Sequence, residues 1–425
     1  MIRPGFSGEW GRNKLSVIKR LWADSAVRYA VITFLVLRIF LTVWAVIVLT
    51  LLPLPAEPDE EVRPYLGEPQ LAEGPSGTLL GPWQRFDTLH YLRIARQGYA
   101  AVPDSVFPPI YPYGMRLIGS LIPGSLILGE RSLSGGLILS NLACIGLFFL
   151  LYKVTATTFS DEAAARRAVL FLAVFPASFF LLAGYSESLF ILLALGSFWS
   201  ARRGRFWLAG LLGFLAALTR LTGWILVVPL AYEFYSQRLM TEGQTSLWPV
   251  DIHGIIGRLR GKNLVMLTAV FLPALGLLTF FALRGLLEMP PLKSVYEGFW
   301  HQSTGIPGWD LVTAVQQILS GNASFVLYLD FLSTFFLLGT TILAFRRLGP
   351  SYGLYSAALL FFMLLPAADQ KPLFSFMRYT LAFFPTFMIL ADAAKNPWIN
   401  RLIFYPSVAL MLYLSGQFFV WGWVA

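Results

Sequence analysis

The sequence has few of the residues on which soluble enzymes and metalloproteins depend. Only 13% of its 425 residues are charged, and it contains one cysteine and three histidines. A lone Cys144 excludes an intramolecular disulfide and argues against a cysteine-based metal site. His90, His253 and His301 are too few for a histidine-rich metal centre. We therefore predict no metal ligand, and a divalent ion is possible but not indicated.

The sequence is rich in apolar residues. They make up 56% of the chain, which is more apolar surface than a soluble domain of this length would bury, so we predict an integral, multi-pass membrane protein. The formal charge of +9 resides in short basic segments between apolar runs, as topology determinants do, and no nucleic-acid partner is expected. We find no internal repeat and no cleavable signal.

Hydropathy divides the chain into spans. A bilayer core of about 30 Å needs about 20 apolar residues per helix, and basic loops stay in the cytoplasm. Together these rules predict an all-α polytopic protein with about eleven transmembrane helices. The predicted spans are 29–54, 133–152, 168–184, 187–201, 206–219, 221–236, 264–287, 323–345, 352–366, 379–392 and 402–423.

We treat residues 1–425 as a single integral membrane domain. The N-terminus (1–28) and the loop 237–263 are predicted to be cytoplasmic. The loops 55–129 and 288–321 are predicted to be extracytoplasmic. The first of these includes an acidic stretch (57–61) and a proline-rich segment (107–129) that we interpret as re-entrant or interfacial rather than spanning.

A polar island lies in the first extracytoplasmic loop. Pro82 suits the first turn of a helix and Gly98 its end, so 82–97 are predicted to form one helix of about four turns. Trp83, Asp87, His90 and Ile94 would share one face, and Arg85, Arg93 and Arg96 another. Asp87 and His90 are the minimum equipment for moving a proton. The arginines suit a substrate phosphate, or lipid headgroups in general.

Several other polar residues are predicted on the same side of the membrane, where they would form one cavity with Asp87 if the loops converge. His90 would either orient Asp87 or contact substrate directly. Arg220 would be recessed between two short helices, which calls for a partner such as Glu187, Asp87 or a phosphate. Glu187 suits the first turn of a helix as well as a functional role. The set is Asp87, His90, Tyr185, Glu187, Arg220, His301 and Arg378, with Trp83, Trp300 and Arg93 as further substrate contacts.

Three ordered blocks resemble the PIG-V-like mannosyltransferase family, which includes the second mannosyltransferase of GPI-anchor assembly. The first block is Phe86-Asp-Thr-Leu-His-Tyr91, followed by Ile94-Ala-Arg-Gln-Gly-Tyr99 and Phe107-Pro-Pro-Ile-Tyr-Pro112. The second and third are 175–190, containing Gly184-Tyr-Ser-Glu-Ser188, and Ala217-Leu-Thr-Arg-Leu-Thr-Gly223. Phe86 departs from the family's usual tryptophan, which affects packing or sugar stacking more than mechanism.

The resemblance implies a GT-C glycosyltransferase with an essential carboxylate in the first extracytoplasmic loop, here Asp87. Asp87 would act as the general base of an inverting transfer from a polyprenyl-phosphate or dolichyl-phosphate sugar. Arg220, and after it Arg378 or the pair Arg93 and Arg96, would hold the leaving phosphate. An apolar groove open to the membrane lipid would take the lipid tail, and a metal is optional.

We therefore expect a membrane glycosyltransferase that moves mannose or another hexose to a lipid or glycan acceptor on the extracytoplasmic face. Sparse cysteine and short loops favour a bacterial plasma membrane; a eukaryotic member would lie in the endoplasmic reticulum membrane. The alternative is a non-catalytic transporter of lipids or lipid-linked sugars, or a scaffold. Transporters often have repeated halves and charges that face both sides, and this chain has neither feature.

Overall fold

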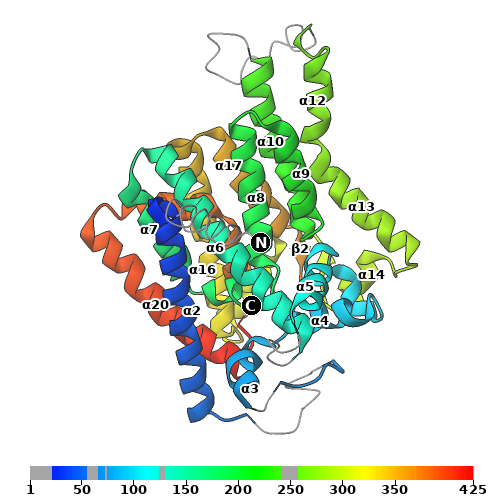
Figure 1. The fold of residues 1–425 in the computed structure, drawn as a ribbon, viewed down its shortest axis with the longest axis vertical. Coiled ribbons are helices and arrows are strands. Elements are labelled where there is room, and N and C mark those ends of the chain that lie inside the picture. Colours follow the sequence, from blue (N-terminus) through cyan, green and yellow to red (C-terminus); the bar gives the residue numbers. More distant parts are fainter. Residues whose placement is uncertain are drawn as a thin grey trace, which may run out of the picture.

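The computed structural model describes residues 22–54, 66–71, 74–123, 130–240, 257–368 and 370–424, which are almost entirely helical (Figure 1). The basic segment before residue 22, the acidic stretch 57–61 and most of the predicted loop 237–263 lie outside the described residues. The all-α class predicted from hydropathy is confirmed for the described part of the chain.

Four described helices are long and apolar enough to cross a membrane, and a fifth span results if one bent pair is counted. The four are α2 (Ser25–Leu51), α6 (Arg131–Phe159), α16 (Phe325–Leu343) with its π-turn η7 (Ala344–Leu348), and α20 (Pro397–Phe419). The bent pair is α12 (Lys262–Val270) and α13 (Leu272–Leu286), which meet at 50°. The protein is thus an integral membrane protein, but the predicted count of about eleven spans is not confirmed.

The other predicted spans correspond to shorter or divided helices. The predicted span 168–184 is wrong as one helix, because α7 ends at Ala173 and a 3-10 turn follows. The predicted span 379–392 is likewise divided, whereas 221–236 lies in one uninterrupted run that passes from 3-10 through α to π geometry. The elements concerned are α7 (Glu162–Ala173), η4 (Ser178–Leu181), α8 (Glu187–Arg202), α9 (Phe206–Ala217), η5 (Leu221–Leu226), α10 (Val227–Phe234), the π-turn η6 (Tyr235–Leu239), α17 (Pro350–Met363), α18 (Phe376–Tyr379), η8 (Thr380–Ala382) and α19 (Phe384–Ala393).

The loop predicted to be the first extracytoplasmic one contains short helices, as its proline and glycine content suggests. They are α3 (Gly74–Leu80), η1 (Gly81–Trp83), α4 (Asp87–Gln97), η2 (Val102–Val106) and α5 (Ile110–Leu121). At 12 residues α5 is too short to cross a bilayer, which agrees with a re-entrant or interfacial segment. It packs closely on α6, where a Cβ on Gly135 would lie 2.2 Å from the Met115 carbonyl oxygen. A glycine is needed at this crossing.

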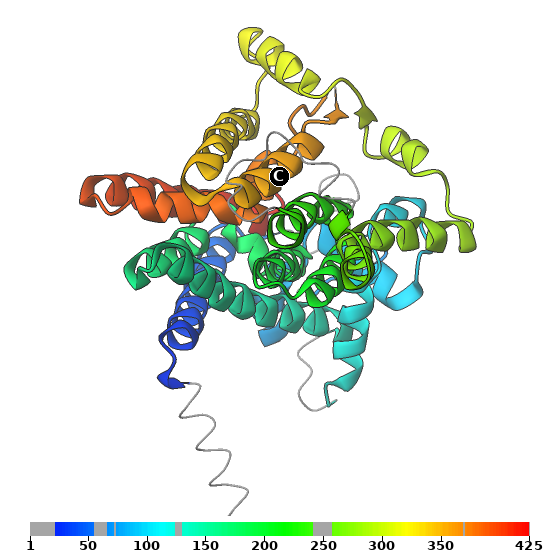
Figure 2. The same cartoon turned by 90° about the horizontal axis from the view of Figure 1, so that it is seen from above.

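The predicted loop 288–321 is also structured. It contains α14 (Leu292–Gly298), β1 (Ser303–Thr304) and α15 (Trp309–Leu319). Seen from above, α13, α14, α15 and α16 follow one another around one side of the bundle (Figure 2). β1 pairs antiparallel with β2 (Pro366–Ala367), with Ser303 opposite Ala367, and this ties the loop to the segment that leads into α18.

Candidate active site

Asp87 is the first residue of α4, which corrects the prediction of one continuous helix over 82–97. The chain forms η1, breaks at Gln84–Phe86 and begins α4 at Asp87. Phe86 has φ +48°, a strained conformation for a non-glycine residue, and the Asp87 N–H donates to the Tyr185 hydroxyl at 3.3 Å. The helix ends as predicted, at Gly98 with φ +76°.

Long-range contacts maintain the break. The Gln84 side chain donates to the Pro69 carbonyl at 2.7 Å, and the Arg85 guanidinium donates to the Phe419 carbonyl at 3.1 Å. The Phe86 ring packs on Trp421 and Trp423, at centroid distances of 5.4 and 5.6 Å. Arg85 is therefore not on the same helix face as Arg93 and Arg96, contrary to the prediction. Phe86 here packs against rings that follow α20.

The turn before α8 lies directly on α4. A Cβ on Gly184 would lie 2.6 Å from Thr88 Cγ2, so only glycine lets this turn approach so closely. Glu187 begins α8 and Ser186 is its N-cap residue, as predicted, but the Ser186 side chain does not cap the helix. Its hydroxyl instead bonds the Tyr91 hydroxyl at 2.9 Å, which joins α4 to α8.

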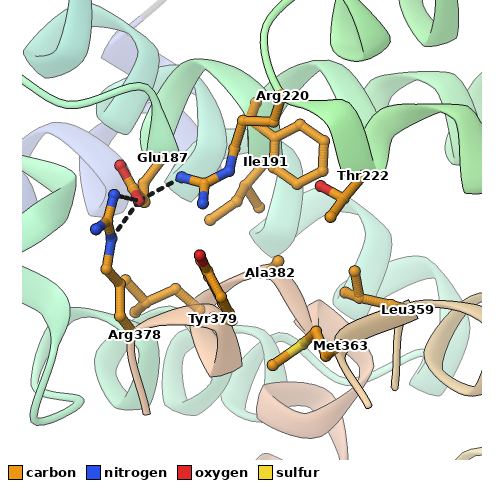
Figure 3. Close-up of a pocket in the computed structure, with 11 residues that line it drawn as sticks. Glu187, Ile191, Arg220, Thr222, Leu359, Met363, Arg378, Tyr379 and Ala382 are labelled. Atoms are coloured by element: carbon orange, nitrogen blue, oxygen red, sulfur yellow. Dashed lines mark hydrogen bonds and ion pairs between the residues drawn. The ribbon is translucent and has the colours of Figure 1, made fainter. Parts of the chain in front are cut away.

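Glu187 lies between two arginines. Its Oε1 accepts a hydrogen bond from Arg378 Nε at 2.6 Å and another from Arg220 Nη1 (Figure 3). Arg378 also donates from Nη2 to Asp87 Oδ2 at 2.7 Å. The side chains of Glu187 and Arg378 are 4% and 6% exposed, whereas that of Asp87 is 19% exposed. Two carboxylates thus share Arg378, and Asp87 is the more open to a substrate.

Arg378 owes its position to acidic residues that the sequence did not single out. The Met377 N–H donates to Asp330 Oδ1 on α16 at 2.8 Å. Asp310 on α15 accepts hydrogen bonds from the backbone N–H groups of Ala368 and Leu373 at 2.8 and 3.0 Å. These bonds fix the segment between β2 and α18 and so aim the guanidinium at Glu187 and Asp87.

A small pocket adjoins this ion cluster. Glu187, Arg220 and Arg378 line its polar end. Apolar side chains from α8, α17 and η8 line the rest, and Figure 3 shows Leu359 and Met363 across the cavity from Glu187. The full lining is Glu187, Phe190, Ile191, Arg220, Thr222, Leu359, Met363, Arg378, Tyr379, Leu381 and Ala382. Such a shape suits a ligand with an anionic head and an apolar tail.

His90 is paired with a residue other than Asp87. Its Nδ1 lies 2.7 Å from Asp104 Oδ1, and Arg93 donates from Nε to Asp104 Oδ2 at 2.6 Å. Asp104 lies on η2 and is fully buried. Sequence reasoning missed it, although an acid between Val102 and Val106, shortly after a histidine and an arginine three residues apart, was a usable signal. Arg93, which was predicted to contact substrate, is thus paired with Asp104 in the structure.

Other predicted contacts are placed differently. Trp300 lies 5.5 Å from His90 between ring centroids, so it joins the aromatic surroundings of His90. Trp83 is fully buried against Phe419, where it presents no surface to a sugar. His301 is exposed, and within the described part of the chain it makes no hydrogen bond or ring contact with the ion cluster. Arg96 pairs with Glu68 at 2.6 Å.

Burial keeps the phenols around the cluster neutral. It raises the pKa of Tyr91 and of Tyr185, so both side chains remain protonated at physiological pH. The charges in contact are then two carboxylates and two guanidinium groups. Among the described residues no three His, Cys, Asp or Glu side chains gather as metal ligands would. Metal dependence stays a prediction.

The sequence is similar to those of known proteins. A family model described as mannosyltransferase (PIG-V) matches residues 25–248. GPI alpha-1,6-mannosyltransferase 2 of Mus musculus is 34% identical over 175 residues, which is 40% of this chain and 33% of that protein. The match therefore spans about a third of the length of the mouse relative.

Two solved structures are also similar to the chain. ArnT from Cupriavidus metallidurans, bound to undecaprenyl phosphate, has a TM-score of 0.41 at 14% identity, covering 78% of this chain and 71% of that one. The oligosaccharyltransferase of Archaeoglobus fulgidus in its apo form has a TM-score of 0.42 at 14% identity, covering 90% of this chain and 56% of that one.

Proposed function

Because the chain belongs to the mannosyltransferase (PIG-V) family, we propose that it is a membrane glycosyltransferase of the GT-C class. It transfers mannose or another hexose from a polyprenyl-phosphate donor to a lipid or glycan acceptor. The active site faces the extracytoplasmic side of a plasma membrane, or the lumen in an endoplasmic reticulum membrane. The observation that carries this proposal is that Glu187, Arg220 and Arg378 line one pocket, while Arg378 also bonds Asp87.

The pocket supports the donor class. A polyprenyl-phosphate sugar has one phosphodiester charge beside a long apolar chain. Arg220 and Arg378 provide guanidinium donors at one end of the pocket, and Leu359 and Met363 provide apolar surface at the other. Arginine suits phosphate because its donors form a planar fork.

Asp87 is the proposed base. Its carboxylate takes the proton from an acceptor hydroxyl, whose oxygen forms a bond to the anomeric carbon. The bond between that carbon and the phosphate oxygen breaks, and its electron pair leaves with the lipid phosphate. Arg378 and Arg220 stabilise the charge that develops on the leaving phosphate. The 19% exposure of the Asp87 side chain gives the acceptor access.

The decisive experiment compares two aspartate variants in a transfer assay. Purified protein in lipid nanodiscs is given radiolabelled polyprenyl-phosphate mannose, or another hexose donor, with candidate acceptors. Asp87→Asn should abolish donor-dependent product. Asp392→Asn is the matched control, because Asp392 is 20% exposed and also pairs with an arginine, Arg347, at 3.1 Å, but lies outside the site.

The control should keep wild-type activity. Full activity in a folded Asp87→Asn protein would refute Asp87 as the base. Movement of the intact lipid-linked sugar across the bilayer, with no transfer to any acceptor, would instead favour the transporter alternative.

A further inference from the structure

The two carboxylate oxygens of Glu187 differ in their hydrogen bonding. Oε1 accepts hydrogen bonds from both Arg220 and Arg378. Oε2 is buried and has no hydrogen-bond partner among the described residues. A buried carboxylate oxygen without a donor is costly, so its presence needs an explanation in the working cycle of the site.

The ion cluster is already balanced in charge. Asp87 and Glu187 contribute two negative charges, and Arg220 and Arg378 contribute two positive charges. The neighbouring triad of His90, Arg93 and Asp104 is balanced in itself when the histidine is neutral.

Phenols also surround the ion cluster. They come from α4, α5, the turn before α8 and α14, and burial raises the pKa of each, so they are neutral at physiological pH. The set is Tyr91, Tyr111, Tyr185 and Tyr296. Tyr379 on α18 lines the adjoining pocket. The buried phenols do not alter the balance of charge.

A donor phosphodiester would upset this balance. It brings one negative charge to two guanidinium groups that already serve carboxylates. The phosphate and Glu187 would then compete for the same N–H donors in a buried site, where like charges repel strongly. One added positive charge would restore neutrality, and a proton on Glu187 supplies it at the atom that has no partner.

We propose that Glu187 takes up one proton from solution when the lipid-phosphate donor binds. The protonated Oε2 then donates a hydrogen bond to a phosphate oxygen, and Arg220 and Arg378 turn their donors from Glu187 to the phosphate. The net charge of the site stays the same. The Glu187 carboxylate and one proton become a neutral carboxylic acid, and the phosphodiester replaces the carboxylate as the anion. This inference rests on the proposed donor class.

The test counts protons during binding. The probe is a polyprenyl methyl phosphate, a diester with a single charge at every pH used and no sugar to be chosen. Its binding to the full-length protein in detergent with EDTA is measured calorimetrically near pH 7.5, in buffers of different ionisation enthalpy. We expect uptake of about one proton per molecule bound. The Kd should then rise by up to about tenfold for each unit by which the pH is raised.

Variants assign the proton. Glu187→Gln should bind without proton uptake and with a Kd independent of pH, while Glu187→Asp should retain uptake. Glu233→Gln is the matched control, because Glu233 is a buried glutamate on α10 that bonds Gln237 at 2.6 Å, away from the pocket. It should behave as the wild type.

Each failure has its own meaning. Binding without proton uptake by the wild-type protein would overturn the role of Glu187 but leave the donor class standing, and this measurement needs no variant. Equal uptake by Glu187→Gln would place the proton elsewhere, and binding that requires added Mg²⁺ would make a metal the missing charge. Absence of any binding would overturn the proposed donor class together with the inference.

Discussion

Arg378 Nη2 lies 2.7 Å from Asp87 Oδ2, although 291 positions separate the two residues in the chain. The family match ends at residue 248, so this arginine comes from a part of the chain that the match does not cover. The Asp87 carboxylate, inside the matched range, is thus held by a side chain from outside that range.

Removing the Arg378 charge should harm both fold and function. Arg378→Gln leaves Glu187 and Asp87 facing each other without their shared cation, and loss of one partner of a buried ion pair costs about 3–5 kcal/mol. We expect a lower thermal midpoint and loss of transfer. Arg347→Gln is the control, because its side chain is 52% exposed and its pair with Asp392 should contribute less than about 1 kcal/mol. Similar midpoints for both variants would contradict the prediction.

Asp104 should determine the tautomer of His90. The Asp104 carboxylate, 2.7 Å away, accepts a hydrogen bond from Nδ1–H, so neutral His90 should carry its hydrogen on Nδ1. Because the chain has three histidines, ¹⁵N-labelled imidazoles can be assigned one by one. Asp104→Asn should move the His90 hydrogen to Nε2 in part of the population and cost about 1.5–3 kcal/mol of stability.

A matched change elsewhere separates this effect from general damage. Asp161→Asn alters an N-cap aspartate of α7 and should leave the His90 spectrum unchanged. A His90 signal unaffected by Asp104→Asn would show that Asp104 does not select the tautomer.

Crowding the turn before α8 should displace Glu187. Gly184→Ala places a methyl group 2.6 Å from Thr88 Cγ2, and such overpacking costs about 1–3 kcal/mol. Adding Thr88→Ser removes that methyl group and should restore part of the stability and activity. Gly339→Ala, on α16 with no atom within 4 Å of the new Cβ, should be neutral. Failure of Thr88→Ser to rescue would place the effect elsewhere.

A bulky side chain in the pocket should block the donor. Thr222 lines the cavity and is partly exposed, so Thr222→Phe would fill space without disturbing a fully buried position. We expect a rise in the donor KM of about tenfold or more, equivalent to about 1.4 kcal/mol, with little change in kcat. Thr279→Phe is the control, because Thr279 is an exposed residue of α13, and it should leave the donor KM unchanged. An unaltered donor KM in Thr222→Phe would argue that the lipid phosphate binds outside this pocket.

Hydropathy predicted the class of the protein and several of the polar residues that lie near Asp87. A bilayer admits few ways to place charge, so clustered arginines fix which loops lie together. Tyr185, Glu187, Arg220 and Arg378 were therefore predicted near Asp87, and the structure brings them within hydrogen-bonding contact of one another. Their chemical roles stay predictions.

Local geometry was less predictable because distant contacts decide it. Nothing in residues 82–97 indicates the break at Gln84–Phe86, which depends on Phe419, Trp421 and Trp423. Helical periodicity predicted that His90 would lie beside Asp87. In the structure His90 instead bonds Asp104, which lies on η2, outside the helix to which the periodicity applies. The divided spans have the same origin, since helices within a bundle can be short when neighbours satisfy their ends.

The contacts between α20 and the start of α4 set an order of biogenesis. Arg85 donates to the Phe419 carbonyl across 334 positions of sequence, and Phe86 rests on rings that follow α20. A ribosome therefore delivers the Asp87 loop long before the helix that holds it in shape. Until α20 has been inserted, the nascent chain lacks the contacts that hold Arg85 and Phe86 in place at the start of α4.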